Sequence, residues 1–177
     1  MQVSETNPET YEHLLTLLHA HGADYHLMDH APVGRTDLVS ALRGHPVEHA
    51  AKCLMLMLKL DRSTRKYVLA VVPGNRKVDL AAVRKLYRAR YAGFCDPATA
   101  ERLARTVAGT VLPFALDPSV ELVVDPDVLA EPRMYFNAAR LDRSISLATA
   151  DYARIGRPAV HTIAEPDQSP PTPACDQ

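Results

Sequence analysis

Two long apolar segments, separated by a short polar stretch, constrain the fold of this chain more than any other feature. The first reads AAKCLMLMLKL (50–60), the second YVLAVVPG (67–74), and DRSTR lies between them. Neither can span a bilayer, which needs roughly 18 apolar residues, because the longest run, Cys53 to Leu58, ends at Lys59. The pattern predicts two long strands joined by a hairpin at the centre of a sheet.

Capping residues predict five helices around this hairpin. Asn7-Pro8 precedes TYEHLLTLLHAHG, which has apolar residues at helical spacing and Gly22 as its stop. Side chains that cap helix N-termini occur at four later positions. These are Thr36 before a helix ending at Gly44, Asp79 before one ending near Tyr87, Asp96 before one through Leu103, and Thr149 before one through Ile155.

Shorter apolar segments predict the remaining strands and the fold class. These are Tyr25–Met28, Tyr91–Phe94, ELVVDP, RMYFNA and SISLA. Because strands and helices mix without regular βαβ alternation, we expect a single compact α+β domain with a mixed, mostly antiparallel sheet over residues 1–157. From Pro158 onward prolines and polar residues dominate, so residues 158–177 are expected to form a Pro-rich disordered tail.

Cysteine usage and charge exclude several classes of protein. The three cysteines are far apart and form no CxxC pair, which argues against a disulfide framework and a zinc cage and favours a reducing cytoplasm. The start, MQVSETNPET, lacks the features of a signal peptide, and no membrane association is expected. With a net charge of −1, any contact with nucleic acid must come from a local basic patch.

Lys52 stands at the start of the most apolar predicted strand. Burying an ammonium group is costly unless it meets an anion, a carbonyl or a ligand, so the position is a candidate for function. The alternative is a strand-end lysine whose head group reaches water. The neighbouring Cys53 should point to the opposite face of the strand, which argues against a covalent mechanism through its thiol.

Histidines concentrate in the first part of the chain, where seven of the eight occur within 49 residues. The pair His45 and His49 lacks the HExxH context of a zinc enzyme, so we expect no metal site. His30 begins the loop HAPVGR between a strand and a helix, where functional residues tend to lie. A loop histidine bonded to the backbone is the alternative.

One basic stretch of the sequence is a candidate for contact with tRNA. Arg84, Lys85, Arg88 and Arg90 are interleaved with Tyr87 and Tyr91, which would set phosphate partners beside stacking surfaces. A solvated helix face explains the same residues equally well.

Several segments in the same order resemble the YbaK/ProX family of aminoacyl-tRNA editing domains, most closely its YeaK-like branch. They are HAPVGRTDLVSALRG, AAKCLMLMLK, YVLAVVPGNRKVDL, GTVLPFALDP and FNAARLDRSISLATADY. The resemblance implies a curved mixed sheet surrounded by helices. It also implies a free-standing trans-editing deacylase, without metal or cofactor, that hydrolyses the ester of tRNA mischarged with a small amino acid such as Ser, Thr or Ala.

The resemblance also implies partners. The protein would contact the acceptor end of aminoacyl-tRNA, alone or near an aminoacyl-tRNA synthetase or an elongation factor, as a monomer or weak homodimer. Two alternatives stay open: a non-catalytic tRNA-binding module, and a biosynthetic enzyme that uses aminoacyl-tRNA as an acyl donor.

By this resemblance Lys52 is the catalytic residue, binding the ester carbonyl or the terminal phosphate. The resemblance assigns substrate binding to further residues on loops and a strand end. They are His30, Gly109, Pro113, Phe114, Asn137, Ala139 and Asp142. Relatives usually carry glycine where this chain has Ala139 and Arg105, and the added side chains are expected to alter the amino-acid pocket or the contact with tRNA.

Overall fold

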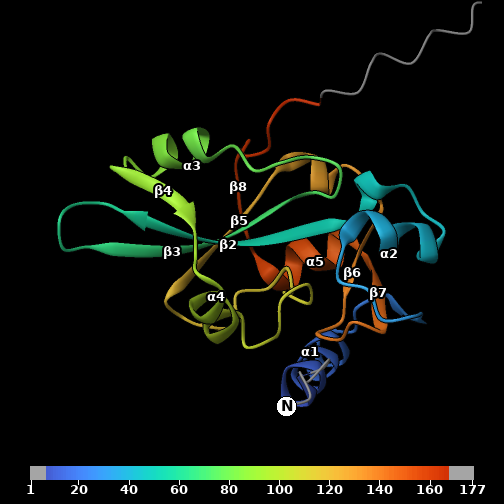
Figure 1. Cartoon of the computed structure of the whole chain (residues 1–177). Helices are drawn as coiled ribbons and strands as arrows, with labels where there is room; N and C mark the ends of the chain where they lie inside the picture. Colours follow the sequence, from blue (N-terminus) through green and yellow to red (C-terminus); the bar gives the residue numbers. More distant parts are fainter. Residues whose placement is uncertain (1–6, 168–177) are drawn as a thin grey trace, which may run out of the picture.

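The computed structural model describes residues 7–167 as one α+β domain (Figure 1). The helices are α1 (Pro8–Ala20), α2 (Thr36–Arg43), α3 (Leu80–Leu86), α4 (Pro97–Ala104) and α5 (Thr149–Gly156), with short 3-10 turns η1 (Val47–His49) and η2 (Pro126–Leu129). The strands are β1 (Tyr25–Asp29), β2 (Ala51–Lys59), β3 (Arg65–Pro73), β4 (Tyr91–Phe94), β5 (Val120–Val124), β6 (Arg133–Asn137), β7 (Arg143–Ala148) and β8 (Ala159–Val160).

The predicted hairpin is the centre of a five-stranded sheet with the order β4-β2-β3-β5-β8. Strands β2 and β3 pair antiparallel from Ala51↔Pro73 to Lys59↔Arg65, whereas β5 and β8 join in parallel. Side chains of the hairpin alternate between two apolar clusters, with Met55 and Leu69 on one face and Leu56 and Val68 on the other. Both faces are therefore covered, which explains why the two segments are apolar almost throughout.

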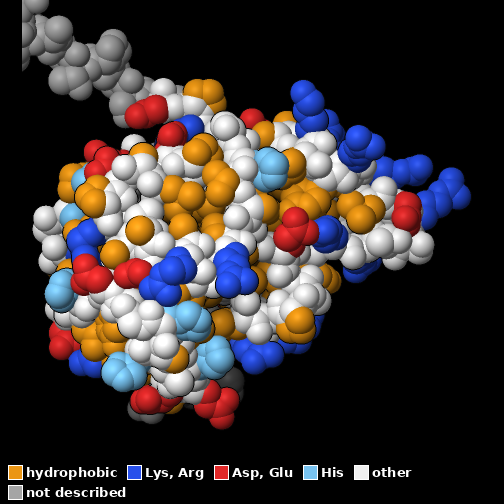
Figure 2. Space-filling view, turned by 180° about the vertical axis from the view of Figure 1, so that it is seen from behind, with side chains coloured by type: hydrophobic (Ala, Val, Ile, Leu, Met, Phe, Trp, Pro, Cys, Tyr) orange, Lys and Arg blue, Asp and Glu red, His pale blue; other side chains and the backbone are white. Residues whose placement is uncertain are grey.

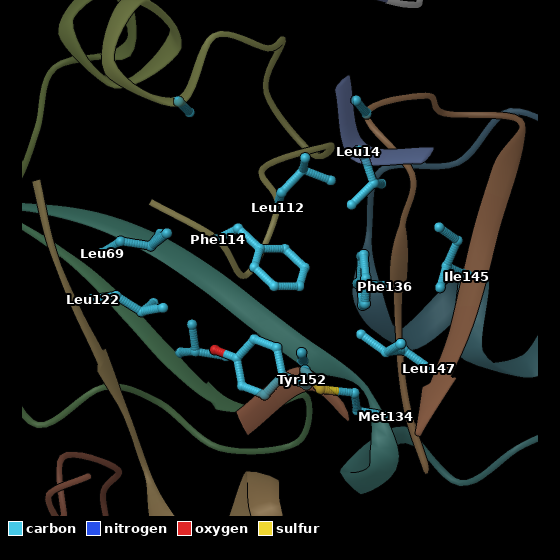
Figure 3. Packing of buried hydrophobic residues seen from close by; sticks show 14 of the residues in the cluster. Leu14, Leu69, Leu112, Phe114, Leu122, Met134, Phe136, Ile145, Leu147 and Tyr152 are labelled. Atoms are coloured by element: carbon cyan, nitrogen blue, oxygen red, sulfur yellow. The ribbon is translucent and has the colours of Figure 1, made fainter. Parts of the chain in front are cut away.

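The other three strands form a separate antiparallel sheet in the order β1-β7-β6. A parallel bridge between Ala50 and Tyr135 links it to the start of β2. The expectation of an α+β fold with a mixed, mostly antiparallel sheet is confirmed, with its strands divided between two sheets. Between the sheets lies the larger cluster, in which the rings of Phe114, Phe136 and Tyr152 pack edge to face (Figure 3).

Three of the expected helix caps are confirmed and two are wrong. The side chains of Asn7, Asp79 and Asp96 accept hydrogen bonds from backbone amides of the first helical turn. Thr36 and Thr149 are instead the first residues of their helices, after Arg35 and Ala148, which make no side-chain cap. At Thr149 the reason is that β7 runs directly into α5, with no loop residue between them.

The folded domain continues past the expected boundary at residue 157. Strand β8 pairs with β5, and the buried Ile163 and Ala164 pack on the sheet face opposite the larger cluster. The buried carboxylate of Asp125 accepts hydrogen bonds from both of their amides, at 2.9 and 2.7 Å. Residues 158–167 therefore belong to the domain, and the rest of the expected tail, 168–177, lies outside the described residues.

Candidate functional site

A cavity of about 420 Å³ lies where the two sheets meet, at the start of β2. Its wall is made by α2 and the segment that leads into it, the first four residues of β2, Gly74 after β3, the loop at Gly109 and the end of β6. Of the residues predicted for function, Lys52, Gly109 and Asn137 line it together. Segments distant in the sequence thus converge on the predicted catalytic lysine.

Lys52 is half-buried at this cavity and has few partners. Its ammonium donates one long hydrogen bond, 3.4 Å, to the carbonyl of Gly74. Burial lowers the pKa of Lys52, and the positive charge of Lys77 lowers it further. Among the described residues no carboxylate pairs with Lys52. With one long hydrogen bond and no acidic partner, the head group is available to an electron-rich group in the cavity.

Asn137, in the wall of the cavity, makes hydrogen bonds to four other residues. Its amide nitrogen donates to the carbonyls of Val33 and Gly109, both at 3.0 Å. This arrangement leaves the amide oxygen to accept from Arg43 at 2.7 Å and from Ser144 at 3.0 Å. With both of its polar atoms in use, Asn137 positions the walls of the site.

Gly109 makes a close backbone approach that no other residue allows. Its φ is +83°, and a Cβ atom there would lie 2.8 Å from the Cα of Gly34. The amides of Gly109 and Val111, both at the cavity, donate no hydrogen bond to any described residue. Unpaired amide N–H groups beside an ammonium can stabilise an oxyanion.

Arg43, which the sequence analysis did not select, also lines the cavity. It is the last residue of α2, where a basic residue is ordinary because it complements the helix dipole, so nothing in the sequence marked it for function. Burial lowers the pKa of its guanidinium to about 10, which leaves the group charged at neutral pH. Three cationic residues therefore line the site, and of these Arg35 is paired with Asp37, whereas Arg43 and Lys52 have no acidic partner among the described residues.

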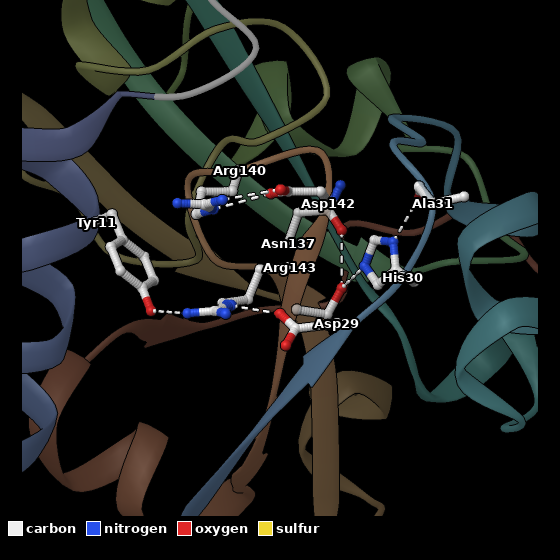
Figure 4. Close-up of polar contacts among 9 residues, drawn as sticks. Tyr11, Asp29, His30, Ala31, Asn137, Arg140, Asp142 and Arg143 are labelled. Atoms are coloured by element: carbon white, nitrogen blue, oxygen red, sulfur yellow. Dashed lines mark hydrogen bonds and ion pairs between the residues drawn. The ribbon is translucent and has the colours of Figure 1, made fainter.

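His30 lies behind this wall and not in it. One ring nitrogen contacts the carbonyl of Ala31 at 2.8 Å and the other contacts the hydroxyl of Ser144 at 2.6 Å (Figure 4). Ser144 in turn accepts from Arg43, so its single hydrogen is left for either His30 or Asn137. His30 supports the polar network from outside the cavity lining.

Four other predicted substrate-binding residues also lie outside the cavity lining. Pro113 and Phe114 are buried, with the ring of Phe114 in the larger apolar cluster. Asp142 pairs with Arg140, whose guanidinium donates two bonds of 2.8 Å to its carboxylate (Figure 4). Ala139 is fully buried and does not reach the cavity.

The two departures from the family pattern share a backbone conformation. Ala139 has a φ of +56°, and Arg105, which ends α4, has a φ of +54°. Glycine adopts this left-handed conformation freely, whereas other residues lose about 1–2 kcal/mol. Neither residue lines the cavity, so the expected change of the amino-acid pocket is not seen. The positive φ at these two positions explains why relatives usually carry glycine there.

The basic stretch lies at the opposite end of β2 from the cavity. Arg84, Lys85, Arg88 and Arg90 are exposed, and the amide of Arg90 bonds the carbonyl of Lys59. Lys59 lies seven positions after Lys52 along the strand, which corresponds to about 23 Å. Lys59, Arg62, Arg65 and Lys66 of the hairpin join this cluster, and Figure 2 shows Lys and Arg side chains gathered at that end.

The two tyrosines of this basic end differ in their availability. The hydroxyl of Tyr87 donates to Glu121 at 2.8 Å, and Lys66 lies over its ring at 5.0 Å. The ring of Tyr91 is about half exposed, at 49%. The ammonium of Lys59 lies 5.4 Å from the centroid of this ring, so the two rings differ in exposure and in the hydroxyl bond of Tyr87 but not in having a lysine over them.

The described residues offer neither a metal cage nor a membrane span. Residues 7–167 contain no group of three His, Cys, Asp or Glu side chains that could hold a metal ion. Within the same range no helix is long and apolar enough to cross a bilayer. Cys53 packs against the larger cluster, and burial raises the pKa of its thiol, which makes the thiol a poor nucleophile.

Comparison with known proteins gives a consistent result. The family model for the aminoacyl-tRNA editing domain matches residues 30–155. The multifunctional Ser/Thr-tRNA deacylase ProXp-y of Escherichia coli K12 is 33% identical over 150 residues, which is 84% of this chain and 89% of that protein. The protein of the same name from Escherichia coli O157:H7 matches equally.

Solved structures share the fold at lower identity. The crystal structure of a hypothetical protein superimposes with a TM-score of 0.76 at 20% identity, over 86% of this chain and 99% of that one. A putative trans-editing enzyme for prolyl tRNA synthetase gives 0.73 at 15% identity, over 89% and 98%.

Proposed function

We propose that this chain, which belongs to the aminoacyl-tRNA editing domain family, uses Lys52 to hydrolyse the ester between a small amino acid and the tRNA that wrongly carries it. The reaction class follows from the family and from the 33% identity to a Ser/Thr-tRNA deacylase: the chain is a free-standing, trans-editing aminoacyl-tRNA deacylase. Serine, threonine and alanine are the amino acids proposed.

The main support for a catalytic role of Lys52 is that its ammonium group has few hydrogen-bonding partners. A half-buried ammonium with one 3.4 Å hydrogen bond and no carboxylate partner among residues 7–167 can stabilise negative charge that develops nearby. The unpaired amides of Gly109 and Val111 share the same cavity. The ammonium of Lys52 and these two amides would bind the oxyanion of the transition state more tightly than the neutral carbonyl of the substrate. Only such preferential binding of the transition state accelerates the reaction.

The proposed chemistry needs only water and the substrate. Water attacks the ester carbonyl carbon, and the charge on the carbonyl oxygen is held by Lys52 and the amides. The bond to the ribose oxygen then breaks, and a proton passes to that oxygen, which releases the amino acid and intact tRNA. We propose that the free ribose hydroxyl of the terminal adenosine orients the water, because the one carboxylate in the cavity lining, Asp37, is already bound by Arg35.

The non-catalytic alternative loses the observation that motivated it. That alternative was based on Ala139 and Arg105, and both lie away from the cavity lining. The acyl-donor alternative requires the same binding residues as hydrolysis. Only the reaction products, a free amino acid or an amino acid joined to an acceptor, distinguish the two.

The basic end of β2 is the proposed contact for the body of the tRNA. Its exposed arginines and lysines lie about 23 Å along the strand from Lys52, a separation that a large substrate can bridge. Acids at this end are few: Glu121 pairs with Lys66 at 2.5 Å, and Asp61 caps its own turn at Ser63. We propose that Arg84, Lys85, Arg88 and Arg90 contact phosphates there.

The broader partners and location remain predictions. These are delivery by a synthetase or an elongation factor, a monomer or weak homodimer, and action in the cytoplasm. Sedimentation of the purified protein, with and without tRNA, measures the oligomeric state.

The test of the function is a panel of tRNAs mischarged with labelled amino acids, including seryl-tRNA on threonine and alanine acceptors. We expect the parent to release free amino acid and uncharged tRNA from at least one member. Lys52→Ala should lower the rate by about 10²–10³, the usual cost of removing an oxyanion donor. Arg102→Ala, an exposed arginine of α4 outside both the cavity lining and the basic end of β2, is the control and should stay close to the parent.

Two results would contradict the proposal. No release from any member of the panel would reject the deacylase activity. Equal rates for Lys52→Ala and the parent would remove Lys52 from the mechanism while leaving the activity in place. Transfer of the amino acid to an added acceptor, in place of its release, would favour the biosynthetic alternative.

A further inference from the structure

The guanidinium of Arg43 is held in a fixed position by neutral groups. Its Nε donates to the hydroxyl of Ser144 at 2.8 Å, and its Nη2 donates to the amide oxygen of Asn137 at 2.7 Å. Asn137 cannot turn away, because its nitrogen is committed to the carbonyls of Val33 and Gly109. The remaining nitrogen, Nη1, donates to no described residue.

The positive charge of Arg43 has no counter-ion in the part of the chain that the structure describes. The one acid that lines the same cavity, Asp37, is bound by Arg35 through two hydrogen bonds of 3.2 and 2.7 Å. Leaving an unpaired charge partly buried is costly, so such sites commonly serve an anionic ligand. The free Nη1 and the missing counter-ion both indicate that an anion binds here.

The proposed substrate brings an anion at a short, fixed distance from its ester. The phosphate that joins the last two nucleotides is attached to the same ribose that carries the amino acid. A planar guanidinium matches the oxygens of a phosphate, whereas a lysine acts only as a point charge. On the premise of the proposed function, we infer that Arg43 binds this terminal phosphate and leaves Lys52 free for the ester carbonyl.

This assignment divides between two residues the roles that the family resemblance implies for Lys52 alone. It also explains the polar network behind the cavity, in which His30 contacts Ser144 and Ser144 contacts Arg43 and Asn137. The network sets the guanidinium relative to the start of β2, and so sets where a bound ribose would place its ester.

The test compares two small substrates that differ only by the phosphate: seryl-adenosine and seryl-adenosine 5′-phosphate. Hydrogen bonds to charged groups are worth about ten- to hundredfold in binding, so the parent should prefer the phosphate-bearing substrate by about that factor in kcat/KM. Arg43→Gln should lose the preference, and Arg43→Lys should keep part of it. Arg154→Gln, a matched arginine that is paired with Asp151 and lies outside the cavity lining, should keep all of it.

Several outcomes would overturn the inference. A parent without preference, or an Arg43→Gln variant that keeps it, would show that Arg43 does not bind the phosphate. The phosphate-binding role would also be rejected if Arg43→Gln slowed the deacylation only of tRNAs charged with acidic amino acids. In that case the guanidinium would bind the carboxylate of the amino-acid side chain. Urea unfolding of each variant shows whether a loss of preference reflects misfolding. If Arg43→Gln does not fold, Arg43→Lys, which retains the positive charge, provides the comparison.

Calorimetry keeps the inference testable if the parent is inactive. Adenosine 5′-monophosphate should bind the parent about ten- to hundredfold more tightly than adenosine, and Arg43→Gln should bind the two alike. Equal binding of the two by the parent would reject the phosphate site. An inactive parent that still discriminates between them would reject the deacylase activity alone.

Discussion

The two ends of strand β2 carry the same residue type in opposite surroundings. Lys52, at the start, is half-buried and donates one long hydrogen bond to a backbone carbonyl. Lys59, at the end, is exposed, and its Nζ lies 5.4 Å from the ring centroid of Tyr91. An ammonium in a cavity without a counter-ion can act on a ligand, whereas one in water beside an aromatic ring is already satisfied.

The two ends also differ in what holds them together. At the cavity the side chain of Asn137 joins the backbone of two loops to Arg43 and Ser144. At the hairpin the comparable contact is the ion pair of Lys66 with Glu121, whose side chains are 35% and 41% exposed. Buried amides that lose a partner are costly and exposed ion pairs contribute little, so side-chain hydrogen bonds should stabilise the surroundings of the strand more at its start than at its end.

The largest expected effect on stability comes from breaking the cavity end. Asn137→Ala removes four hydrogen bonds and leaves buried polar groups unpaired, so we expect a loss of about 2–4 kcal/mol in the free energy of unfolding. Lys66→Ala at the hairpin end should cost about 0–1 kcal/mol. Urea unfolding of both variants measures the contrast. Similar costs would mean that the two ends are held equally.

A smaller effect is expected when the basic end loses charge. If Arg88 and Arg90 each contact a phosphate, the double variant Arg88→Ala, Arg90→Ala should flatten the slope of log(kcat/KM) against log salt by about 0.7–0.9 per contact. Arg102→Ala, an exposed arginine of α4, should leave the slope unchanged. An unchanged slope in the double variant would mean that Arg88 and Arg90 do not contact phosphates and are only solvated surface residues.

The smallest expected effect is a shift of the pH dependence through Lys77. The protonated form of Lys52 is the one that stabilises the oxyanion, so deacylation should fall as pH rises through its lowered pKa. Lys77→Gln removes a nearby positive charge, which should raise that pKa and move the alkaline limb to higher pH. Lys85→Gln serves as the control. The measurement is the deacylation rate as a function of pH, corrected for uncatalysed hydrolysis. If the alkaline fall in rate occurs at the same pH in Lys77→Gln and the parent, Lys77 does not lower the pKa of Lys52.

Local signals predicted much of the fold. The paired apolar segments gave the central hairpin, because strands with both faces covered need apolar residues throughout. Asn7, Asp79 and Asp96 predicted three helix starts, since their side chains satisfy the first free amides. These features depend on neighbours a few residues away, which a sequence displays directly.

Contacts between distant segments were not visible in the same way. Residues 158–167 look like a polar, proline-containing tail, yet the carboxylate of Asp125 and the edge of β5 hold them in place from about 35 to 40 positions away. The resemblance to a family marked Lys52, Gly109 and Asn137, but it did not separate cavity residues from those that support them, such as His30 and Phe114.

The sequence by itself determined the class of fold, the family and the lysine on which the proposed chemistry depends. Only the tertiary structure decided why that lysine differs from Lys59 and which other cation joins it. Charge, burial and missing partners are properties of a place in three dimensions, and Arg43 acquires its unpaired charge only where α2, β6 and β7 meet. The site at Lys52 is therefore made by the surroundings that folding gives to an ordinary residue.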